Sequence, residues 1–324
     1  MTKDAADLTI TRLNVNHCHE IQRCFQQVYG DTYANELFYD TEALAAALES
    51  STLRSVGALN AAGEVIAHMA MVLPSTDCIY PELGNTVVDP RARGGGLAWR
   101  VGAELRAWSE ELGYTGFVHY PTTDHHIMQR QSVKQGFELG VMLGYIPAQT
   151  DGKVKDDPAR MLRGAATIVF EPYGQPQPIL QVFMPARFDE VIRQVAEHAN
   201  LEREWHTCQE PKGATKLEVV SLAKRGLTRI LVRHGGDDFD AVLNLAMRAP
   251  QECVQLDFLM DDPGMDACVE RATDSGFLFC GWLPGRYHTD VLRLQWVEES
   301  RTDMQPGVVN PVAKRLLTET IHVA

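Results

Sequence analysis

Apolar residues in the first half of the chain recur with two different periods, one typical of strands and one typical of helices. Segments that alternate polar and apolar residues predict strands, and segments with apolar residues three and four apart predict helices. The predicted order is a strand (8–13), two helices (17–29, 41–48), three strands (53–59, 65–73, 80–88), a helix (96–112), a strand (117–120), a helix (126–135) and a pair of strands (136–147). This succession favours an α/β fold with a mixed sheet.

Turn and cap residues separate these segments. A loop at 60–64 contains Gly63 and joins two apolar runs as a hairpin. Pro90 ends the strand before it, because proline cannot donate to a sheet ladder. Thr41 is the expected cap of the second helix, and Gly113 closes the helix at 96–112.

The second half is set apart by a polar stretch at 151–165, which we interpret as a linker between a domain at 1–150 and another at 166–300. The second domain is predicted to contain a strand, a helix (187–199), two strands (216–222, 227–233), a helix (239–248), and then a strand, a helix and two strands. The tail at 301–324 carries apolar residues at helical spacing, Val312, Leu316, Leu317 and Ile321. A length of 324 residues agrees with two domains.

Composition excludes several classes of protein. The chain is 45% hydrophobic and 23% charged, a globular balance, and it has neither an apolar run long enough to span a bilayer nor a basic-then-apolar N-terminal segment. We therefore expect a soluble, cytoplasmic protein with no membrane partner. The net charge of −13 argues against nucleic acid and agrees with an amine substrate. Seven cysteines without a C-x-x-C pair argue against disulfides and against a metal site.

The segment at 87–98 combines a strand end, a proline and a glycine-rich turn that leads directly into a helix. The first turn of a helix offers unpaired N–H groups and the positive end of the helix dipole, which suit a diphosphate. Glycines let the backbone approach the anion, and Arg91 and Arg93 add positive charge. Trp99 stands where a dinucleotide-binding loop requires a third glycine, and no Gly-Lys-Ser/Thr follows, so two other phosphate loops are excluded.

This segment resembles the acyl-CoA pyrophosphate loop of the GNAT superfamily of N-acetyltransferases, V-x-P-x-x-R-G-x-G-(L/I)-(G/A). The matching residues are Val88, Pro90, Arg93, Gly94, Gly96, Leu97 and Ala98. A second stretch, 132–138, resembles the family's helix that ends in Gly-Phe before two closing strands. The resemblance covers roughly residues 6–150 and implies a GNAT fold there.

The resemblance implies direct transfer of an acetyl group from acetyl-CoA, as co-substrate, to an amine, with no covalent enzyme intermediate and no metal. The pantetheine arm would lie between the strand that ends at Val88 and the strand that ends at Tyr120. The residues expected to contact acetyl-CoA are Val87, Val88, Arg91, Arg93, Gly94, Gly95, Gly96, Leu97, Ala98 and Ser132.

Catalysis by this route needs a neutral attacking amine and a protonated leaving thiol. Glu82 lies on the strand before the loop, where many members of the family place a general base, and histidines 119, 125 and 126 have reference pKa values near neutrality. The family's usual tyrosine, four residues before the glycine of Gly-Phe, is Ser132 here. Tyr120, Tyr145 or water is expected to take its place. The candidate catalytic residues are Glu82, Tyr120, His126 and Tyr145.

The second half repeats part of this pattern. The stretch 268–277 resembles the helix that ends in Gly-Phe, and 230–232 stands where Val87 and Val88 stand in the first half. Asp237, Asp238 and Asp240 follow, and acids at a helix start would repel a pyrophosphate. We therefore predict a degenerate GNAT-like repeat that does not bind CoA. It could wall the acceptor cleft, form a homodimer or bind another partner.

The sequence thus predicts an N-acetyltransferase whose acceptor is a small-molecule amine or a protein amine. Three alternatives stay open. One is a CoA-binding sensor without catalysis, suggested by Ser132. The others are transfer of a longer acyl chain, and protein acetylation in which the second domain grips the protein.

Overall fold

The computed structural model describes residues 8–148, 162–247 and 252–322. The chain forms two compact units, unit 1 (residues 1–117) and unit 2 (118–324). Within the described ranges, no helix is long and apolar enough to cross a bilayer.

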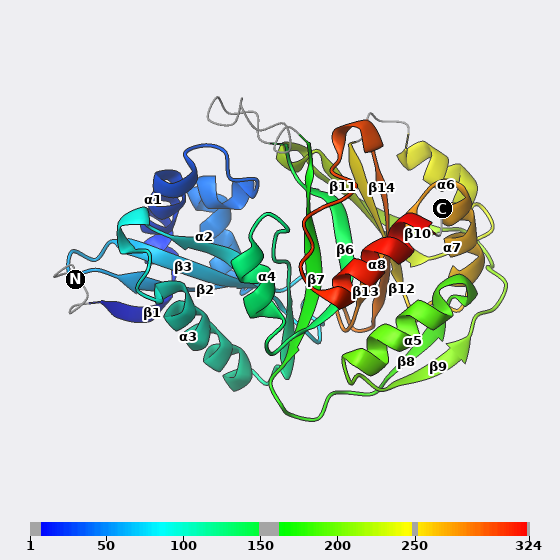
Figure 1. Ribbon diagram of the computed structural model, residues 1–324, viewed down its shortest axis with the longest axis horizontal. Coiled ribbons are helices and arrows are strands. Elements are labelled where there is room, and N and C mark those ends of the chain that lie inside the picture. Colours follow the sequence, from blue (N-terminus) through cyan, green and yellow to red (C-terminus); the bar gives the residue numbers. More distant parts are fainter. Residues whose placement is uncertain (1–7, 149–161, 248–251, 323–324) are drawn as a thin grey trace. The chain divides into compact units, whose positions relative to one another are not determined.

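Unit 1 is a four-stranded antiparallel arrangement covered by helices on both faces (Figure 1). Its strands follow the chain order, β1 (Thr9–Leu13), β2 (Leu53–Leu59), β3 (Val65–Val72) and β4 (Glu82–Val88). The helices α1 (Cys18–Tyr29) and α2 (Thr41–Glu49) lie above these strands in Figure 1, and α3 (Leu97–Glu111) lies below them. The strand β5 (Gly116–His119) straddles the boundary between the units.

The two faces of β3 show how the sequence pattern builds these layers. Ala70 belongs to the core under α1, together with the buried Ile21 and Phe25 of that helix. Met69 points the other way, and its Cε would lie 3.3 Å from a Cβ placed on Gly102 of α3. Because side chains alternate along a strand, one strand serves both layers.

The cap of α2 differs from the expected one. Asp40, not Thr41, accepts hydrogen bonds from the backbone amides of Glu42 (3.0 Å) and Ala43 (2.9 Å). The helix therefore begins at Thr41, one residue after its cap. A carboxylate satisfies two of the open amides at once and complements the helix dipole, which explains the difference.

Unit 2 contains a long sheet with the strand order β7-β6-β13-β14-β12-β11-β10. These strands are β6 (Phe137–Ile146), β7 (Gly164–Pro172), β10 (Lys216–Leu222), β11 (Leu227–His234), β12 (Cys253–Leu259), β13 (Leu278–Leu283) and β14 (Val291–Val297). Strands β11 and β12 are parallel, and the other pairs are antiparallel. A separate parallel pair consists of β8 (Leu180–Met184) and β9 (Arg203–Thr207).

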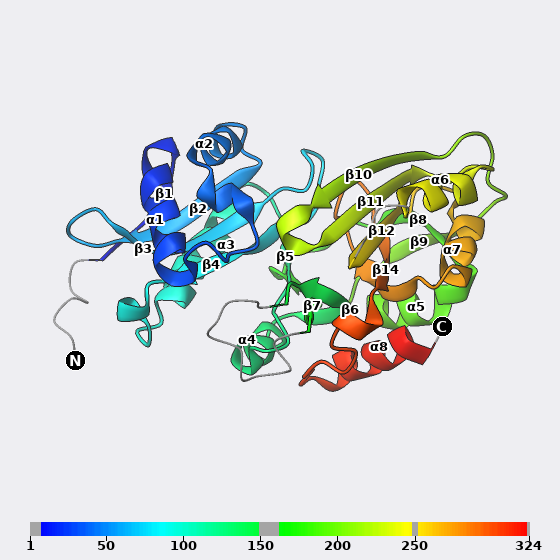
Figure 2. The ribbon, with the colours of Figure 1, turned by 90° about the horizontal axis from the view of Figure 1, so that it is seen from above.

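The helices of unit 2 are α4 (His126–Ser132), α5 (Asp189–His198), α6 (Phe239–Ala246), α7 (Met265–Asp274) and α8 (Pro311–His322). In both views, α5 and α8 lie side by side (Figures 1 and 2). The helix α8 packs on β6 and β13, so the helical pattern predicted in the tail corresponds to a real helix.

The predicted pair of strands at 136–147 is wrong, because the segment is one continuous strand, β6. Its partner is β7, which begins at Gly164. Gly140 does not turn the chain. It lets β6 approach β13 so closely that an added Cβ would strike the carbonyl oxygen of Cys280. The preceding helix is also shorter than predicted and ends at Ser132.

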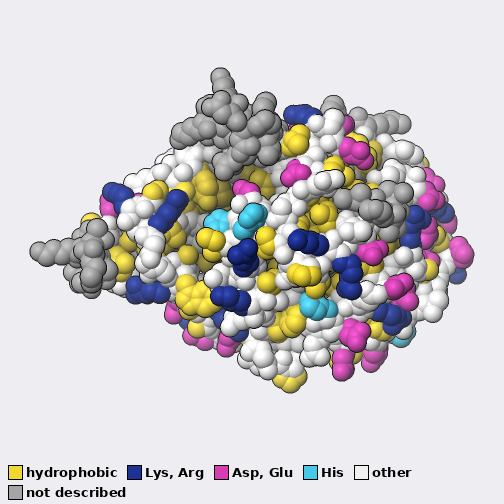
Figure 3. All heavy atoms as spheres, in the orientation of Figure 1, with side chains coloured by type: hydrophobic (Ala, Val, Ile, Leu, Met, Phe, Trp, Pro, Cys, Tyr) yellow, Lys and Arg dark blue, Asp and Glu magenta, His cyan; other side chains and the backbone are white. Residues whose placement is uncertain are grey.

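Most of the linker predicted at 151–165 lies outside the described residues. The predicted domain boundaries stay a prediction, since the compact units follow contacts between segments and divide the chain at residue 117. On the face visible in Figure 3, basic side chains are interspersed with acidic and apolar ones and form no continuous stripe.

Burial gives unit 2 a pH-dependent instability. Glu138 of β6 is 3% exposed, and desolvation raises the pKa of its carboxyl from 4.5 to about 7. A carboxyl whose pKa is higher in the folded state loses stability as pH rises from its unfolded pKa to its folded pKa. The penalty is absent near pH 4.5 and complete above about pH 7.

We expect Glu138→Gln to stabilise the protein at pH 8, by up to about 3 kcal/mol, and to have little effect at pH 5. Thermal unfolding of both forms at the two pH values measures this. Glu202→Gln, an exposed carboxylate, is the matched control and should change neither midpoint. An equal gain for Glu138→Gln at both pH values would show that burial of the charge is not the cause.

Candidate functional site

The glycine-rich turn after β4 is built by two left-handed residues. Gly94 has a φ of +85° and Gly96 has a φ of +68°, a region that glycine adopts at no steric cost. Gly96 is the N-terminal cap residue of α3. The turn therefore delivers the chain from the end of β4 to the start of α3 with no side chain over the helix end.

The start of α3 is open. No side chain caps it, and an added Cβ at Gly94, Gly95 or Gly96 would have nothing within 4 Å. The helix has 15 residues, so its dipole places partial positive charge at this end. Leu97 is buried and anchors the first turn, whereas the three glycines are exposed. Exposed amides at a dipole end form a binding site for an anion.

Arg91 contributes less charge to this site than the sequence suggested. Its guanidinium donates to both carboxylate oxygens of Asp89, with Nη2 2.6 Å from Oδ2 and Nε 3.0 Å from Oδ1. Asp89 is 2% exposed, and the hydrogen bonds from Arg91 lower the pKa of its carboxyl. The pair is internally neutral and fixes the turn. The expectation that Arg91 adds positive charge for a bound anion stays a prediction.

Unlike Arg91, which donates to a carboxylate, Arg93 donates to a backbone carbonyl. Its Nε donates to the carbonyl oxygen of Val88 at 3.2 Å, and its side chain is exposed. The end of β4 is fixed on β3, where Val87 pairs with His68 and Val88 with Ala67. Ala98 follows Leu97 in the first turn and is half-buried.

A bulge in β4 lies just before the loop and was not predicted. Asn85 and Thr86 together stand opposite the single residue Met69 of β3, and Asn85 has a φ of +51°. The side-chain oxygen of Asn85 accepts from the Tyr33 hydroxyl (3.0 Å) and the Asn35 amide (3.2 Å). An asparagine inside an apolar strand was the available sequence signal, since asparagine tolerates the left-handed region.

His68 of β3 stabilises this bulge through a hydrogen bond. Its Nδ1 lies 3.0 Å from the carbonyl oxygen of Asn85, and its Nε2 lies 3.0 Å from Oγ of Ser55. A carbonyl only accepts, so Nδ1 carries the proton and Nε2 accepts from the serine. Burial lowers the pKa of His68 to about 4, so the ring is neutral at pH 7. Glu82, the predicted base, begins β4 opposite Val72 and is half-buried.

In unit 2, the structure brings Tyr120 and Tyr145 together. Their ring centroids are 6.0 Å apart. The Tyr120 hydroxyl accepts from Nη1 of Arg286 at 2.8 Å, and the Tyr145 hydroxyl accepts from Nη1 of Arg225 at 2.7 Å. Each phenol oxygen thus accepts one hydrogen bond from an arginine. No sequence motif pointed to these two arginines, because they are distant in the chain.

The other candidates in unit 2 are placed differently. His126 begins α4 and is exposed, while Nδ1 of His125 accepts from the amide of Met128 as the helix cap. Burial lowers the pKa of His119 to about 4, so that ring is neutral at pH 7. Ser132 is 4% exposed, and among the described residues its Oγ has no hydrogen-bond partner.

The corresponding turn of the second half is filled by the chain itself. The amide of Gly235 donates to Oδ2 of Asp262 at 2.6 Å, and Oδ1 of Asp238 accepts from the amide of Thr215 at 2.7 Å. An added Cβ at Gly236 would strike the carbonyl oxygen of Gly213. The amides of Gly235 and Gly236 are thus occupied by acceptors of the chain itself, Asp262 and Thr215.

Strands β11 and β12 also leave no slot for a pantetheine arm, since they pair continuously from Leu227–Cys253 to Val232–Phe258. Both features are physical reasons for the expectation that the second half does not bind CoA.

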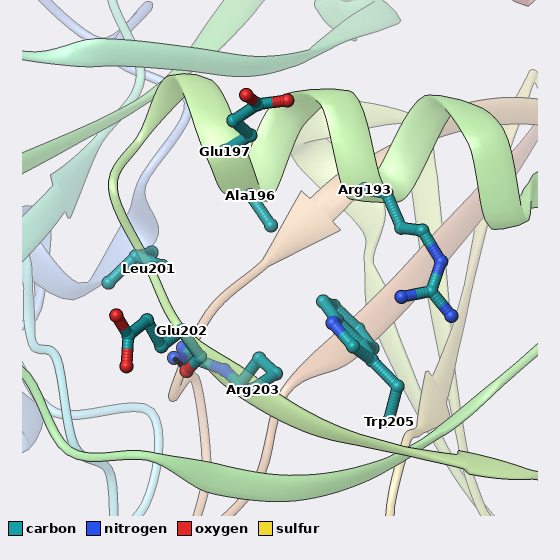
Figure 4. A pocket seen from close by; sticks show the side chains of 7 residues that line it. All are labelled: Arg193, Ala196, Glu197, Leu201, Glu202, Arg203 and Trp205. Atoms are coloured by element: carbon teal, nitrogen blue, oxygen red, sulfur yellow. Dashed lines mark hydrogen bonds between the residues drawn. The ribbon is translucent and has the colours of Figure 1, made fainter.

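A hollow of about 430 Å³ lies elsewhere in unit 2, between α5 and β9 (Figure 4). The Arg193 guanidinium stacks 5.2 Å from the Trp205 ring, and Glu197 and Glu202 stand at its rim. Arg203 in its lining is committed to a fully buried ion pair with Asp290, with Nε 2.6 Å from Oδ2. The two arginines that line this hollow are engaged within the fold, Arg193 with Trp205 and Arg203 with Asp290. The described lining of the hollow shows no arrangement for acyl transfer.

Comparisons with known proteins give structural neighbours alone. No family model matches the chain, and no curated protein matches it. The putative acetyltransferase yncA from Salmonella typhimurium, solved with acetyl-CoA, is 13% identical, with a TM-score of 0.43 over 53% of this chain and 98% of that one. A GNAT-superfamily phosphinothricin acetyltransferase from Sinorhizobium meliloti is 15% identical, with a TM-score of 0.42 over 53% of this chain and 92% of that one.

A ribosomal-protein-alanine N-acetyltransferase from Brucella melitensis is also similar, at 15% identity and a TM-score of 0.41 over 51% of this chain and 99% of that one. The neighbours are acetyltransferases, several of them named as GNAT proteins. Each of these three covers about half of the chain. At such low identities and TM-scores, the likeness by itself says nothing about the substrate or mechanism of this chain.

The loop geometry predicts opposite effects for two neighbouring glycines. We expect Gly94→Ala to destabilise the protein by about 1 kcal/mol, because alanine is strained at a φ of +85°. Gly95→Ala should be neutral or slightly stabilising, because Gly95 lies outside the left-handed region and its Cβ would be in open space. Thermal unfolding compares the two. Equal destabilisation would contradict the described turn.

Proposed function

We propose that this chain is a GNAT-superfamily N-acetyltransferase that moves an acetyl group from acetyl-CoA to an amine. One observation carries the proposal. The glycine turn of 94–96 leaves the N-terminal amides of α3 uncapped and exposed directly after β4. That arrangement suits the pyrophosphate of CoA, and it coincides with the sequence pattern that resembles the family's loop.

In the proposed reaction, a neutral amine attacks the thioester carbonyl carbon, a C–N bond forms and the C–S bond breaks. The amine gives up a proton, and the thiolate of CoA takes one up. The backbone amides of the Gly94–Gly96 turn and of the start of α3, together with the Arg93 guanidinium, hold the pyrophosphate. The backbone of Val87 and Val88 faces the pantetheine arm. Glu82 is the proposed proton acceptor.

Tyr120 or Tyr145 is the proposed proton donor to the thiolate. A phenol can both accept and donate a hydrogen bond, and each of these two accepts one from an arginine. Ser132 does not take this role, since its short side chain is buried at the end of α4. The acceptor is a small-molecule amine or a protein amine.

We further propose that the second half is a degenerate repeat and that one chain binds one acetyl-CoA. The chain order β11–α6–β12–α7–β13 repeats the order β4–α3–β5–α4–β6. Gly276-Phe277 precedes β13 as Gly136-Phe137 stands at the start of β6. In the turn between β11 and α6, the amides of Gly235 and Gly236 donate to Asp262 and to the hydroxyl of Thr215.

A second candidate function is an acyl-CoA sensor without turnover. It is favoured by the buried Ser132 at the position where the family's tyrosine is expected. The two functions separate in an assay of free thiol release with a panel of amines and with acetyl- and succinyl-CoA. A sensor binds the thioester but releases no thiol beyond the uncatalysed rate.

Calorimetric titration with acetyl-CoA tests the proposed loop. We expect wild type to bind one equivalent with micromolar affinity, about −8 kcal/mol. Gly96→Asp should weaken binding at least ten-fold more than Gly96→Asn. Both side chains tolerate a positive φ and are nearly equal in size, so the difference isolates the negative charge. It should shrink at high salt, because salt screens exposed charges. Two equivalents would contradict the degenerate repeat, and no binding would contradict the function.

Removing the phenol that protonates the thiolate should slow turnover about 100-fold without changing the KM for acetyl-CoA. We expect this of either Tyr120→Phe or Tyr145→Phe, measured by thiol release at saturating amine. The turnover rate of the double variant should equal that of the slower single variant, because only one proton is transferred. Normal turnover in all three variants would assign the proton to water.

A further inference from the structure

An exposed tryptophan lies beside the proposed anion site. Trp99, the third residue of α3, is 69% exposed, whereas Leu97, Val101 and Leu105 of the same helix are at most 4% exposed. At about 100° per residue, Trp99 points about 150° away from that buried stripe. Leaving so much apolar indole surface in water is unfavourable, and it adds nothing to the stability of the fold.

The geometry of a helix favours an indole at this position that leans toward the glycine turn. Side chains on a helix lean toward its N-terminus, so a residue covers the surface over the turn that precedes it. The turn that precedes Trp99 is Gly94–Gly96, which has no side chains of its own. Arg93 and Arg100 are exposed on either side of it in the sequence. An exposed aromatic residue is therefore close in sequence to exposed glycines and exposed arginines.

We propose that Trp99 stacks on the adenine ring of the acyl-CoA whose pyrophosphate binds at the start of α3. This inference rests on the proposed function. From its pyrophosphate, CoA extends in two directions. The thioester end has to reach the reacting amine past the end of β4, and the adenosine end leaves outward. Trp99 occupies the outward face, and a purine offers a π-surface that an indole can cover.

A protein-binding role fits this surface less well. In the described part of α3, the one other large apolar side chain that is exposed is Leu112 at its C-terminal cap, 41% exposed and on the far end of the helix. A protein interface buries a contiguous patch with an apolar centre, and a lone indole between two arginines is not such a patch.

Calorimetry with two ligands tests the inference on the full chain. Acetyl-CoA carries adenosine, and acetyl-4′-phosphopantetheine lacks it. We expect Trp99→Ala to weaken acetyl-CoA binding about ten-fold and to leave acetyl-4′-phosphopantetheine binding unchanged. Trp99→Phe should restore part of the loss, because it retains a ring. Leu112→Ala, on the same helix, is the matched control and should bind like wild type.

Tryptophan emission provides a second readout. Stacking should quench emission when acetyl-CoA is added to wild type, and the quench should be absent in Trp99→Ala. Wild-type affinity for acetyl-CoA in Trp99→Ala would overturn this inference and leave the proposed function intact. Equal weakening of both ligands, or a change of molecular mass in light scattering, would also overturn it in favour of a structural or interface role. No binding of acetyl-CoA to wild type would overturn the proposed function with it.

Discussion

The open N-terminus of α3 is the constraint on which the proposed chemistry depends. Two left-handed glycines, Gly94 and Gly96, turn the chain from β4 into the helix without placing a side chain over its first amides. The ion pair between the buried Asp89 and the exposed Arg91 fixes the turn from one side, and burial of Leu97 fixes it from the other. The turn thus has its shape before any ligand arrives, and for the proposed anion site such preorganisation lowers the entropic cost of binding.

The second half shows what happens when the same local order lacks this opening. A strand, a glycine pair and a helix recur at β11 and α6, yet the amide of Gly235 is bound by the carboxylate of Asp262. An internal carboxylate competes with any external anion at no translational cost, so the turn serves the fold instead. Comparable secondary structure therefore leads to an open, exposed turn in one half and a packed turn in the other.

The sequence predicted short-range features well and long-range ones poorly. The bounds of β2 agree with the predicted strand at 53–59, and α1 and α8 lie where apolar periodicity placed them. The predicted pair of strands at 136–147 failed because Gly140 serves a close approach to β13, a contact between residues far apart in the chain. The bulge at Asn85 escaped notice for a similar reason, since its supports, Tyr33 and His68, come from other elements.

What the sequence by itself determined is the loop, because a glycine's φ and a helix's open amides are local properties that the order strand, proline, glycines, helix encodes. The tertiary structure alone decided how charge is distributed around the candidate residues. It neutralised Arg91 with Asp89, and it brought Arg286 and Arg225 to the two tyrosines. Electrostatic neighbours depend on distances through space, and those distances exist only once the chain has folded.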